Sequence, residues 1–388
     1  MFDYIATDQQ LKNLLQQLDA SEWLTLDTEF IRENTYFPKL CLIQIASENV
    51  LACIDPLSIK DLQPLFIWLA EPKRVKVLHS AWQDLELLYH VSGGLLPTPI
   101  FDTQVAAAIV GMGDQIGYGR LVEACVGIDL EKSQARTDWA QRPLTPQQLE
   151  YAIDDVRYLR DVYLFLQHEI KQLGREQWLN KALQRLMDRQ TYAIDVQTSW
   201  QRVRNLQLLK PAQLAVLREL AKWREQYAVQ HNIPRRWIVN DELLLELARK
   251  QPQSIEAIKV LRSMTEELAN QYAADWLQCI QAGRAVEKAN WPQLPKRRKL
   301  DTELQLVADL LMLVLQKIAQ QHELAPQLIA TRPQIEKMLV ENRSQLAEDW
   351  RGALVNDTFQ GILQGQIQVT VMNQQLQLLK MSTTNPIA

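Results

Sequence analysis

Two carboxylates end a short apolar segment near the N-terminus and give the first indication of chemistry. Trp23–Leu26 reads as a buried strand, and Asp27 and Glu29 follow it. Because side chains alternate along a strand, these two acids point to the same face. Adjacent carboxylates repel each other unless a proton or a cation neutralises them, and hard divalent cations prefer carboxylate oxygens. The pair is either two solvated acids at a strand end or half of a metal site, and this segment alone favours the solvated acids.

Two later segments carry residues of the same chemical kind. Asp84 lies in a predicted helix directly after a strand at Val75–His79, and Tyr151 and Asp155 lie in a helix predicted from Thr145. The Thr-Pro-Gln-Gln start of that second helix is typical of a capping box with proline at the first helical position. Residues four apart share one helix face, so the phenol would lie one turn from the carboxylate. That geometry suits a phenol beside a metal-bound water, although an exposed Tyr–Asp pair explains the spacing equally well.

The elements that would position these residues form an α/β pattern in the first 170 residues. Further strands are predicted at Leu40–Ala46 and Val50–Ile54, with gaps short enough for adjacent antiparallel pairing. Asp102 or Thr103 is the expected N-cap of the next helix, which makes Asp102 a structural rather than a catalytic residue. The segment Gly111–Gly119 matches no phosphate-binding loop and is interpreted as a flexible connection. Helices are predicted at 8–19, 60–70, 103–110 and 120–126.

The net charge of −4 conceals an uneven distribution of charge along the chain. Residues 1–170 contain 13 Lys and Arg against 24 Asp and Glu, and residues 171–388 contain 29 against 22. An acidic front half joined to a basic back half predicts a metal-dependent site followed by a module for an anionic partner. Chance surface composition is the alternative, and the charge distribution favours the functional interpretation only slightly.

Composition places the chain among globular proteins of two or three domains. Its hydrophobic content is 47% over 388 residues, and no apolar run approaches the length of a membrane span. The first residues contain no basic stretch followed by an apolar core, so no signal peptide is predicted. The cysteines have no metal-ligand spacing and are expected to be reduced thiols in the cytosol. They are Cys41, Cys53, Cys125 and Cys279.

The back half is helical and contains a weak internal repeat. Strand patterns nearly disappear after Lys171 and return only near 366–371. Two helical modules are predicted at 208–285 and 297–365. At an offset of 91 residues, the run His231-Asn232-Ile233 aligns with His322-Glu323-Leu324, and the apolar positions that follow keep the same register. This pattern indicates a duplicated small helical domain.

Together these segments resemble the DEDD family of 3′→5′ exonucleases. Asp27-Thr28-Glu29-Phe30 resembles its first motif, His79 to Asp84 its second, and Tyr151 to Asp155 the tyrosine form of its third. The flanking residues are most similar to the ribonuclease D family, in particular the segment from Lys132 to Thr145. The back half resembles the helicase-and-ribonuclease-D C-terminal (HRDC) domain, present twice. The resemblance covers nearly the whole chain, and the second HRDC-like copy is its faintest part.

The resemblance implies a fold and a set of domain boundaries. The fold is α/β plus all-α, with a ribonuclease-H-like exonuclease domain around a mixed sheet, followed by two small helical HRDC-type domains. The expected boundaries are 1–170 for the exonuclease domain, 171–207 for a helical linker, 208–288 for the first HRDC domain, 296–370 for the second HRDC-like domain and 371–388 for a C-terminal tail.

The resemblance also implies a chemistry for the five motif residues. Asp27 would bridge two divalent ions, Mg²⁺ or Mn²⁺, and Glu29 and Asp155 would help to hold the ion that carries the attacking water. Asp84 would support the second ion through water. Tyr151 would orient the attacking water, because an unperturbed phenol titrates near pH 10 and is a poor base at neutral pH. All-oxygen ligands suit these metals, and no His/Cys cluster indicates zinc.

The implied activity is trimming of the 3′ ends of transfer RNA precursors in the cytoplasm, with release of 5′-mononucleotides. RNA is the expected partner, with no membrane and no obligate protein partner. Basic side chains could neutralise phosphates and aromatic rings could stack on bases. The candidate contacts are Phe30, Lys210, Arg235, Arg236, Trp237, Lys296, Arg297, Arg298 and Lys299. Two alternatives stay open: a DNA-directed exonuclease of the same family, and a catalytically idle RNA-binding scaffold.

Overall fold

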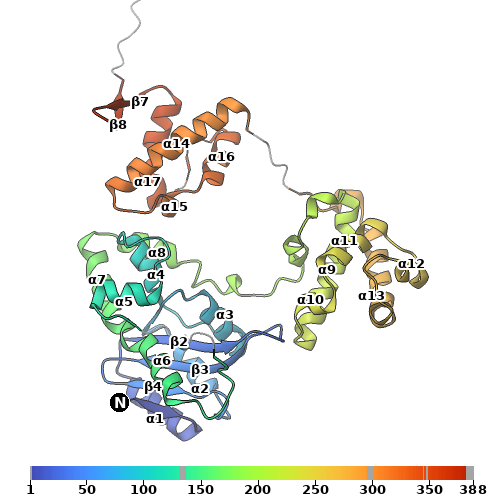
Figure 1. Cartoon of the computed structure of the whole chain (residues 1–388), viewed down its shortest axis with the longest axis horizontal. Coiled ribbons are helices and arrows are strands. Elements are labelled where there is room, and N and C mark those ends of the chain that lie inside the picture. Colours follow the sequence, from blue (N-terminus) through green and yellow to red (C-terminus); the bar gives the residue numbers. More distant parts are fainter. Residues whose placement is uncertain (1, 131–136, 295–299, 344, 347, 382–388) are drawn as a thin grey trace, which may run out of the picture. The chain divides into compact units, whose positions relative to one another are not determined.

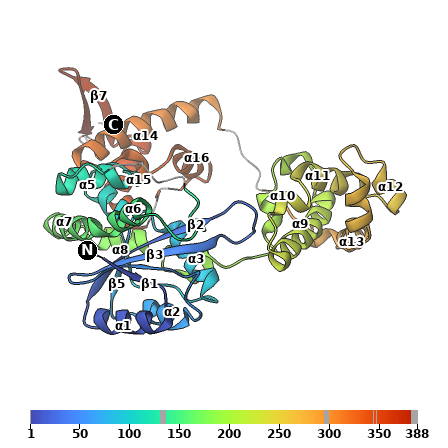
Figure 2. The same cartoon turned by 60° about the horizontal axis from the view of Figure 1, so that its bottom comes forward.

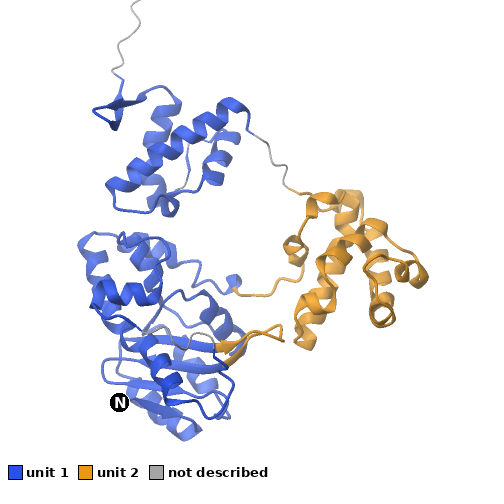
Figure 3. Ribbon diagram, in the orientation of Figure 1, with its two compact units in different colours: residues 1–29, 41–191, 298–388 blue, residues 30–40, 192–297 orange. Residues whose placement is uncertain are grey.

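A computed structural model describes residues 2–130, 137–294, 300–343, 345–346 and 348–381. The chain divides into two compact units (Figure 3). Unit 1 contains residues 1–29, 41–191 and 298–388, and unit 2 contains residues 30–40 and 192–297. Each unit is described by itself. No helix in the described ranges combines the length and the apolar character needed to cross a bilayer.

A six-stranded mixed sheet forms the centre of the first half of the chain. Its strand order is β1-β4-β3-β2-β5-β6. The pairs β1·β4, β2·β5 and β5·β6 are parallel, and β3·β4 is antiparallel, so the predicted mixed sheet is confirmed. The strands are β1 (Asp3–Ile5), β2 (Trp23–Ile31), β3 (Lys39–Ala46), β4 (Leu51–Ile54), β5 (Val75–Leu78) and β6 (Ile100–Asp102).

Eight helices accompany this sheet in the described part of unit 1. In Figure 2, α1 and α2 lie below the sheet, and α6 and α7 lie above it. The strand β1 is absent from the sequence-based prediction, because three residues are too few for a periodicity to be read. The helices are α1 (Asp8–Leu18), α2 (Gln63–Ala70), α3 (Trp82–Val91), α4 (Thr103–Ile109), α5 (Tyr118–Val126), α6 (Pro146–Arg157), α7 (Leu159–Gln172) and α8 (Glu176–Leu183).

Two predicted helix starts have the expected caps. The Thr145 side chain accepts from the backbone N–H of Gln148, and the Gln148 side chain accepts from the Thr145 backbone N–H, which closes the capping box of α6. The Asp102 carboxylate accepts from the backbone N–H groups of Gln104 and Val105 at the start of α4. These bonds satisfy amide groups that a helix leaves unpaired at its N-terminus. Both predicted caps are therefore confirmed.

Unit 2 is helical apart from the segment 30–40, and its core centres on the fully buried Trp276. Helix α9 packs against α11 and α13 (Figure 1). Leu217 and Leu220 of α9 and Leu244 of α11 belong to the same core. Its helices are α9 (Pro211–His231), α10 (Arg235–Ile238), α11 (Asp241–Lys250), α12 (Ile255–Lys259) and α13 (Glu266–Arg284). Short 3₁₀ helices occur at Arg189–Thr191 in unit 1 and at Ser199–Arg202, Leu206–Leu208 and Lys288–Asn290 in unit 2.

The last helical module, in unit 1, repeats the local geometry of unit 2 in register. The first helices start at 211, 235 and 241 in unit 2 and at 302, 326 and 332 in the last module, a constant offset of 91. Left-handed backbone recurs at the same offset, at Asn232 and Glu323 and again at Gln251 and Asn342. The elements of the last module are α14 (Thr302–Gln321), α15 (Pro326–Ile329), α16 (Arg332–Val340), α17 (Trp350–Leu363), β7 (Ile367–Met372) and β8 (Gln375–Lys380).

The C-terminal hairpin crosses an expected domain boundary. The boundary between 370 and 371 falls inside β7, which pairs with β8 as an antiparallel hairpin. Val369 and Leu378 pack against the core of the last module. The described part of the expected tail therefore contributes to that module, and the sequence does not reveal this because the hairpin is only half-buried.

The last module contacts the α/β half of the chain within unit 1. Arg175 donates to the carbonyl oxygens of Ile109 (2.7 Å) and His322 (2.9 Å). The rings of Trp178 and Trp350 stack with centroids 4.5 Å apart. At Gly111, where φ is +95°, a Cβ atom would lie 2.3 Å from the carbonyl oxygen of Glu323. The first glycine of the segment interpreted as a flexible connection thus permits a close backbone approach that another residue would block.

Candidate active site

The strand β2 and the helix α6 bring three acids together. Carboxylate oxygens of Asp27, Glu29 and Asp155 all lie within 4.8 Å of one another. Alternation along β2 turns Asp27 and Glu29 to the same face, as expected, and α6 presents Asp155 to them. The donors are all carboxylate oxygens, and such a cluster fits Mg²⁺ or Mn²⁺ better than zinc.

Asp84 lies beside these three acids without belonging to the same tight cluster. It occupies the first turn of α3 and is buried, with 7% of its surface exposed. Its carboxylate accepts a hydrogen bond from the hydroxyl of Thr28, which also lies on β2. Its charge raises the pKa of Asp27, Glu29 and Asp155, after the larger effect of burial. The four predicted carboxylates therefore interact electrostatically, although three segments of the chain supply them.

Burial and mutual repulsion make these acids hard to ionise when no cation is present. Burial, followed by the charges of neighbouring acids, raises the pKa of Glu29 to about 8 and that of Asp155 to about 7. Burial is also the main cause that raises the pKa of Asp84 to about 6, while the hydrogen bond from Thr28 opposes it. The pKa of Asp27 is raised well above its ordinary value by burial and by the charges of Asp84, Asp155 and Glu29. A divalent cation would relieve this repulsion.

These shifts predict how stability depends on pH when metal is absent. Acids with a raised pKa bind more protons in the folded chain than in the unfolded chain, so stability falls as pH rises from the unfolded pKa values near 4 to the folded values near 6–8. In EDTA, the free energy of unfolding should fall by at least about 2 kcal/mol between pH 5 and pH 8. Saturating Mn²⁺ should restore most of that loss at pH 8 and little at pH 5. Unfolding curves that respond to Mn²⁺ equally at both pH values would contradict this prediction.

Tyr151 lies one turn before Asp155 on α6. Burial, followed by the charges of Asp155, Glu29 and Asp27, raises its pKa further above its ordinary value. The phenol therefore keeps its proton at neutral pH and can donate or accept a hydrogen bond. The ring of the buried Trp139 lies beside it, with centroids 6.2 Å apart.

A second phenol near the acids is absent from the sequence-based prediction. The Tyr118 hydroxyl donates to the carbonyl oxygen of Asp154 (2.7 Å). Burial raises its pKa, and so do the charges of Asp155 and Asp27. The carboxylate of Asp154 itself pairs with Arg157 (2.5 Å), so Asp155 rather than Asp154 joins the acidic cluster. Tyr118 lies within Gly111–Gly119, the segment interpreted as a flexible connection, although α5 already starts at this residue.

An ion pair between the buried Asp55 and the half-buried Arg142 fixes the segment that precedes α6. Asp55, at the end of β4, accepts from the Arg142 guanidinium through both oxygens, at 2.8 and 2.9 Å. Arg142 also donates to the carbonyl oxygens of Cys41 on β3 (2.6 Å) and of Trp139 (2.8 Å). One side chain therefore joins β3 and β4 to the segment that places Trp139 beside Tyr151. Sequence reasoning does not find this pair, because its members are far apart in the chain.

The candidate RNA contacts differ in their surroundings. Lys210, Arg236 and Trp237 are exposed in unit 2, with Trp237 62% exposed. Arg235 pairs with the buried carboxylate of Glu225 (3.3 Å), so part of its charge is already neutralised. Phe30 is half-buried near the end of β2. The remaining candidates, Lys296, Arg297, Arg298 and Lys299, lie outside the described residues.

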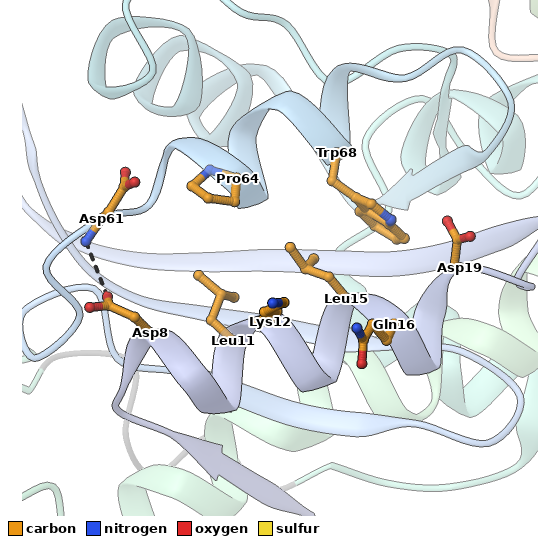
Figure 4. Close-up of a pocket in the computed structure, with 9 residues that line it drawn as sticks. All are labelled: Asp8, Leu11, Lys12, Leu15, Gln16, Asp19, Asp61, Pro64 and Trp68. Atoms are coloured by element: carbon orange, nitrogen blue, oxygen red, sulfur yellow. Dashed lines mark hydrogen bonds between the residues drawn. The ribbon is translucent and has the colours of Figure 1, made fainter.

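A groove elsewhere in unit 1 does not belong to this site. It lies between α1 and α2, has a volume of about 630 Å³, and includes Leu11, Leu15 and Trp68 in its lining (Figure 4). None of the predicted catalytic residues lines it. The Asp8 carboxylate at its edge accepts from the backbone N–H of Asp61, so this acid serves local structure.

Comparison with known proteins supports the predicted exonuclease domain and one HRDC domain. A family model described as 3′-5′ exonuclease matches residues 2–171, and an HRDC domain model matches residues 213–280. Ribonuclease D of Bartonella henselae is 39% identical over 95% of this chain and 91% of that protein, and ribonuclease D of Nitrobacter hamburgensis is 35% identical over 95% and 97%. The crystal structure of Escherichia coli RNase D, described as an exoribonuclease involved in structured RNA processing, superposes with a TM-score of 0.82 at 31% identity, covering 94% of this chain and 99% of that one.

Proposed function

Since this chain belongs to the ribonuclease D family of 3′→5′ exoribonucleases, we propose that it trims the 3′ ends of transfer RNA precursors by two-metal-ion hydrolysis. The observation that supports this most strongly is the cluster of Asp27, Glu29 and Asp155, with Asp84 beside it, on an exonuclease fold. Partly buried acids that raise one another's pKa destabilise a fold, so their presence favours catalysis over an idle scaffold. The reaction would take place in the cytoplasm, on RNA and without an obligate protein partner.

In this mechanism the carboxylates hold and position the ions. Asp27, Glu29 and Asp155 would hold the divalent ions, and Asp84 would support the site from beside this cluster. When bound, two divalent ions activate water and neutralise charge on the phosphate and on the departing 3′ oxygen.

Tyr151 would orient the attacking water with its protonated hydroxyl, and Trp139 would limit the movement of that ring. Attack on the terminal phosphodiester breaks the bond to the 3′ oxygen, which becomes the new RNA end. The phosphate stays with the released 5′-mononucleotide.

The substrate assignment has a direct test. The protein would be incubated with a 3′-extended transfer RNA precursor, an unstructured RNA and a single-stranded DNA of equal length, each with Mg²⁺ and with EDTA. We expect 5′-mononucleotides from the precursor, released only with metal and stopping near the mature end. Digestion of DNA at the same rate would favour the DNA-directed exonuclease, and binding of RNA without any release would favour the scaffold.

We also propose that the last module is a second HRDC-type domain. The constant offset of 91 residues through three helices supports this, together with the left-handed residues at Asn232 and Glu323. The last long helix of each module departs from the register, because α13 starts at Glu266 and α17 at Trp350. The two modules therefore share their first three helices and differ after Gln251 and Asn342.

The first HRDC module should contribute phosphate contacts through exposed basic residues. Replacing Arg236 by glutamine should weaken RNA binding and reduce the slope of log affinity against log salt by about 0.7 for one lost contact with single-stranded RNA. Lys12→Gln provides a matched control, because Lys12 is an exposed basic residue on α1. Affinity measured by fluorescence anisotropy at four salt concentrations would show the difference. Equal slopes for both variants and the natural chain would exclude Arg236 as a contact.

A further inference from the structure

Thr25 is a fully buried polar residue on β2, and none of the roles assigned so far uses it. A buried hydroxyl is costly unless it finds a partner. The Thr25 hydroxyl donates to the carbonyl oxygen of Val156 (2.9 Å), while the carbonyl oxygen of Ala46 on β3 is more distant (3.4 Å). The main contact of Thr25 is therefore with α6, far away in the sequence.

The accepting carbonyl lies in the last turn of α6. Carbonyl groups in a last helical turn have no partner within their own helix and need one from elsewhere. Val156 is the residue after Asp155, and α6 ends at Arg157. The hydroxyl thus holds the end of the helix that carries the third acid of the cluster.

The other end of this contact lies on the strand that carries the first two acids. Thr25, Asp27 and Glu29 alternate along β2 and share one face. A single hydrogen bond therefore connects the residue two positions before Asp27 with the residue directly after Asp155. The carboxylates of Asp27 and Asp155, which lie next to the two ends of this connection, repel each other. Other contacts must therefore set the distance between them.

Apolar packing contributes to that spacing but leaves it less specific. Ala152, Ile153 and Val156 are buried on α6 and hold the helix against the sheet. Apolar contacts tolerate small sliding movements, whereas a hydrogen bond has a defined length and direction. Among the described residues, a single hydrogen bond joins β2 to α6, the one from Thr25.

We propose that Thr25 is a positioning residue of the metal site: its bond to Val156 sets the distance between Asp155 and the acids of β2. The inference rests on the proposed function, since it assigns Thr25 to the same metal site. It makes no claim that Thr25 touches metal or substrate.

The test compares Thr25→Val, which keeps the shape and removes the hydroxyl, with Thr25→Ser, which keeps the hydroxyl. Mn²⁺ affinity would be measured by calorimetry on the full chain, and turnover on the RNA substrate would be separated into kcat and KM. We expect Thr25→Val to weaken Mn²⁺ binding about 10-fold and to lower kcat by about 10-fold with KM nearly unchanged, as is common for residues that orient metal ligands. Thr25→Ser should restore both to within about threefold of the natural chain.

Ser92→Ala is the matched control for the loss of a buried hydroxyl. Ser92 is 5% exposed and donates to the carbonyl oxygen of Leu95 (2.9 Å), outside the acidic cluster. The Ser92→Ala substitution should lower the melting temperature without changing Mn²⁺ affinity. If Thr25→Val behaves like this control, Thr25 is only a structural residue and the proposal is overturned.

Two further arms keep the result decisive. If Thr25→Val does not fold, Thr25→Cys carries the same expectation, because a thiol fills similar space and is a weak donor. If the natural chain binds Mn²⁺ but does not degrade RNA, the proposed function fails while the calorimetric comparison still decides the role of Thr25.

Discussion

Replacing Asp27 by asparagine should abolish RNA degradation while leaving the protein folded. The amide keeps the shape of the side chain but removes a charge that two ions would share, so kcat should fall by at least about 10³-fold, equal to about 4 kcal/mol of transition-state stabilisation. In EDTA the variant should be at least as stable as the natural chain, because the carboxylate of Asp27 is opposed by burial and by three other acids. The melting temperature should no longer rise when Mn²⁺ is added. Turnover and melting temperature can be measured on the same samples.

Tyr151→Phe is the companion to this experiment. It keeps all four carboxylates, so Mn²⁺ should raise its melting temperature as it does for the natural chain. The loss of one hydroxyl that orients water should slow turnover by about 10²-fold or less. A normal rate for the Asp27 variant in Mg²⁺, or a larger loss for the Tyr151 variant than for the Asp27 variant, would show that the roles are wrongly assigned.

The second large effect is expected on stability, at the ion pair of Asp55 and Arg142. Asp55 is 1% exposed, and besides Arg142 its carboxylate accepts from Tyr4 (2.8 Å), Ser58 (2.7 Å) and the backbone N–H of Leu57 (3.0 Å). Asp55→Ala leaves the half-buried guanidinium of Arg142, whose side chain is 23% exposed, without its carboxylate partner. We expect a loss of about 3–5 kcal/mol in the free energy of unfolding, measured in urea.

An exposed acid on a neighbouring strand provides the control. Asp3→Ala, on β1, should change the free energy of unfolding by less than about 0.5 kcal/mol. Burial raises the pKa of Asp55, but the hydrogen bonds from Arg142, Ser58 and Tyr4 outweigh it and lower the pKa to about 2. The contribution of Asp55 is therefore present above pH 4 and is lost as pH falls toward 2. If Asp55→Ala were as stable as Asp3→Ala, the pair would not hold β3 and β4 to the segment before α6.

Local signals in the sequence predict the elements of the exonuclease half well. The caps at Asp102 and Thr145 depend on neighbouring residues, and the strands from β2 to β5 have clear apolar runs. Such features are readable because the energy that favours them arises within a few residues. The same holds for the pairing of Asp27 with Glu29 on one face of β2.

Local sequence patterns do not predict which distant segments lie close together in the fold. For the acidic cluster, only the family resemblance predicts this. The positions of Asp84 and Asp155 in the sequence do not predict that both side chains lie near β2. The partners of Thr25, Thr28 and Asp55 are separated from them by 131, 56 and 87 positions, and each depends on the completed packing of the domain. Tyr118 is not predicted as a site residue for a different reason: it lies within Gly111–Gly119, where the sequence shows no periodic pattern.

The offset of 91 residues pairs positions in and next to α9–α11 with positions in and next to α14–α16, and several of the paired side chains differ. The pairs are Lys210 with Asp301, Arg236 with Gln327, and Trp237 with Leu328. Cationic and aromatic side chains of the first module thus correspond to acidic, amide and aliphatic side chains of the last module. Within unit 1, Gln327 donates to Asp114 (2.8 Å). At these positions the last module does not repeat the side chains of the first. A chain without residues 208–288 would therefore contain no equivalent of Arg236 and Trp237 at the paired positions.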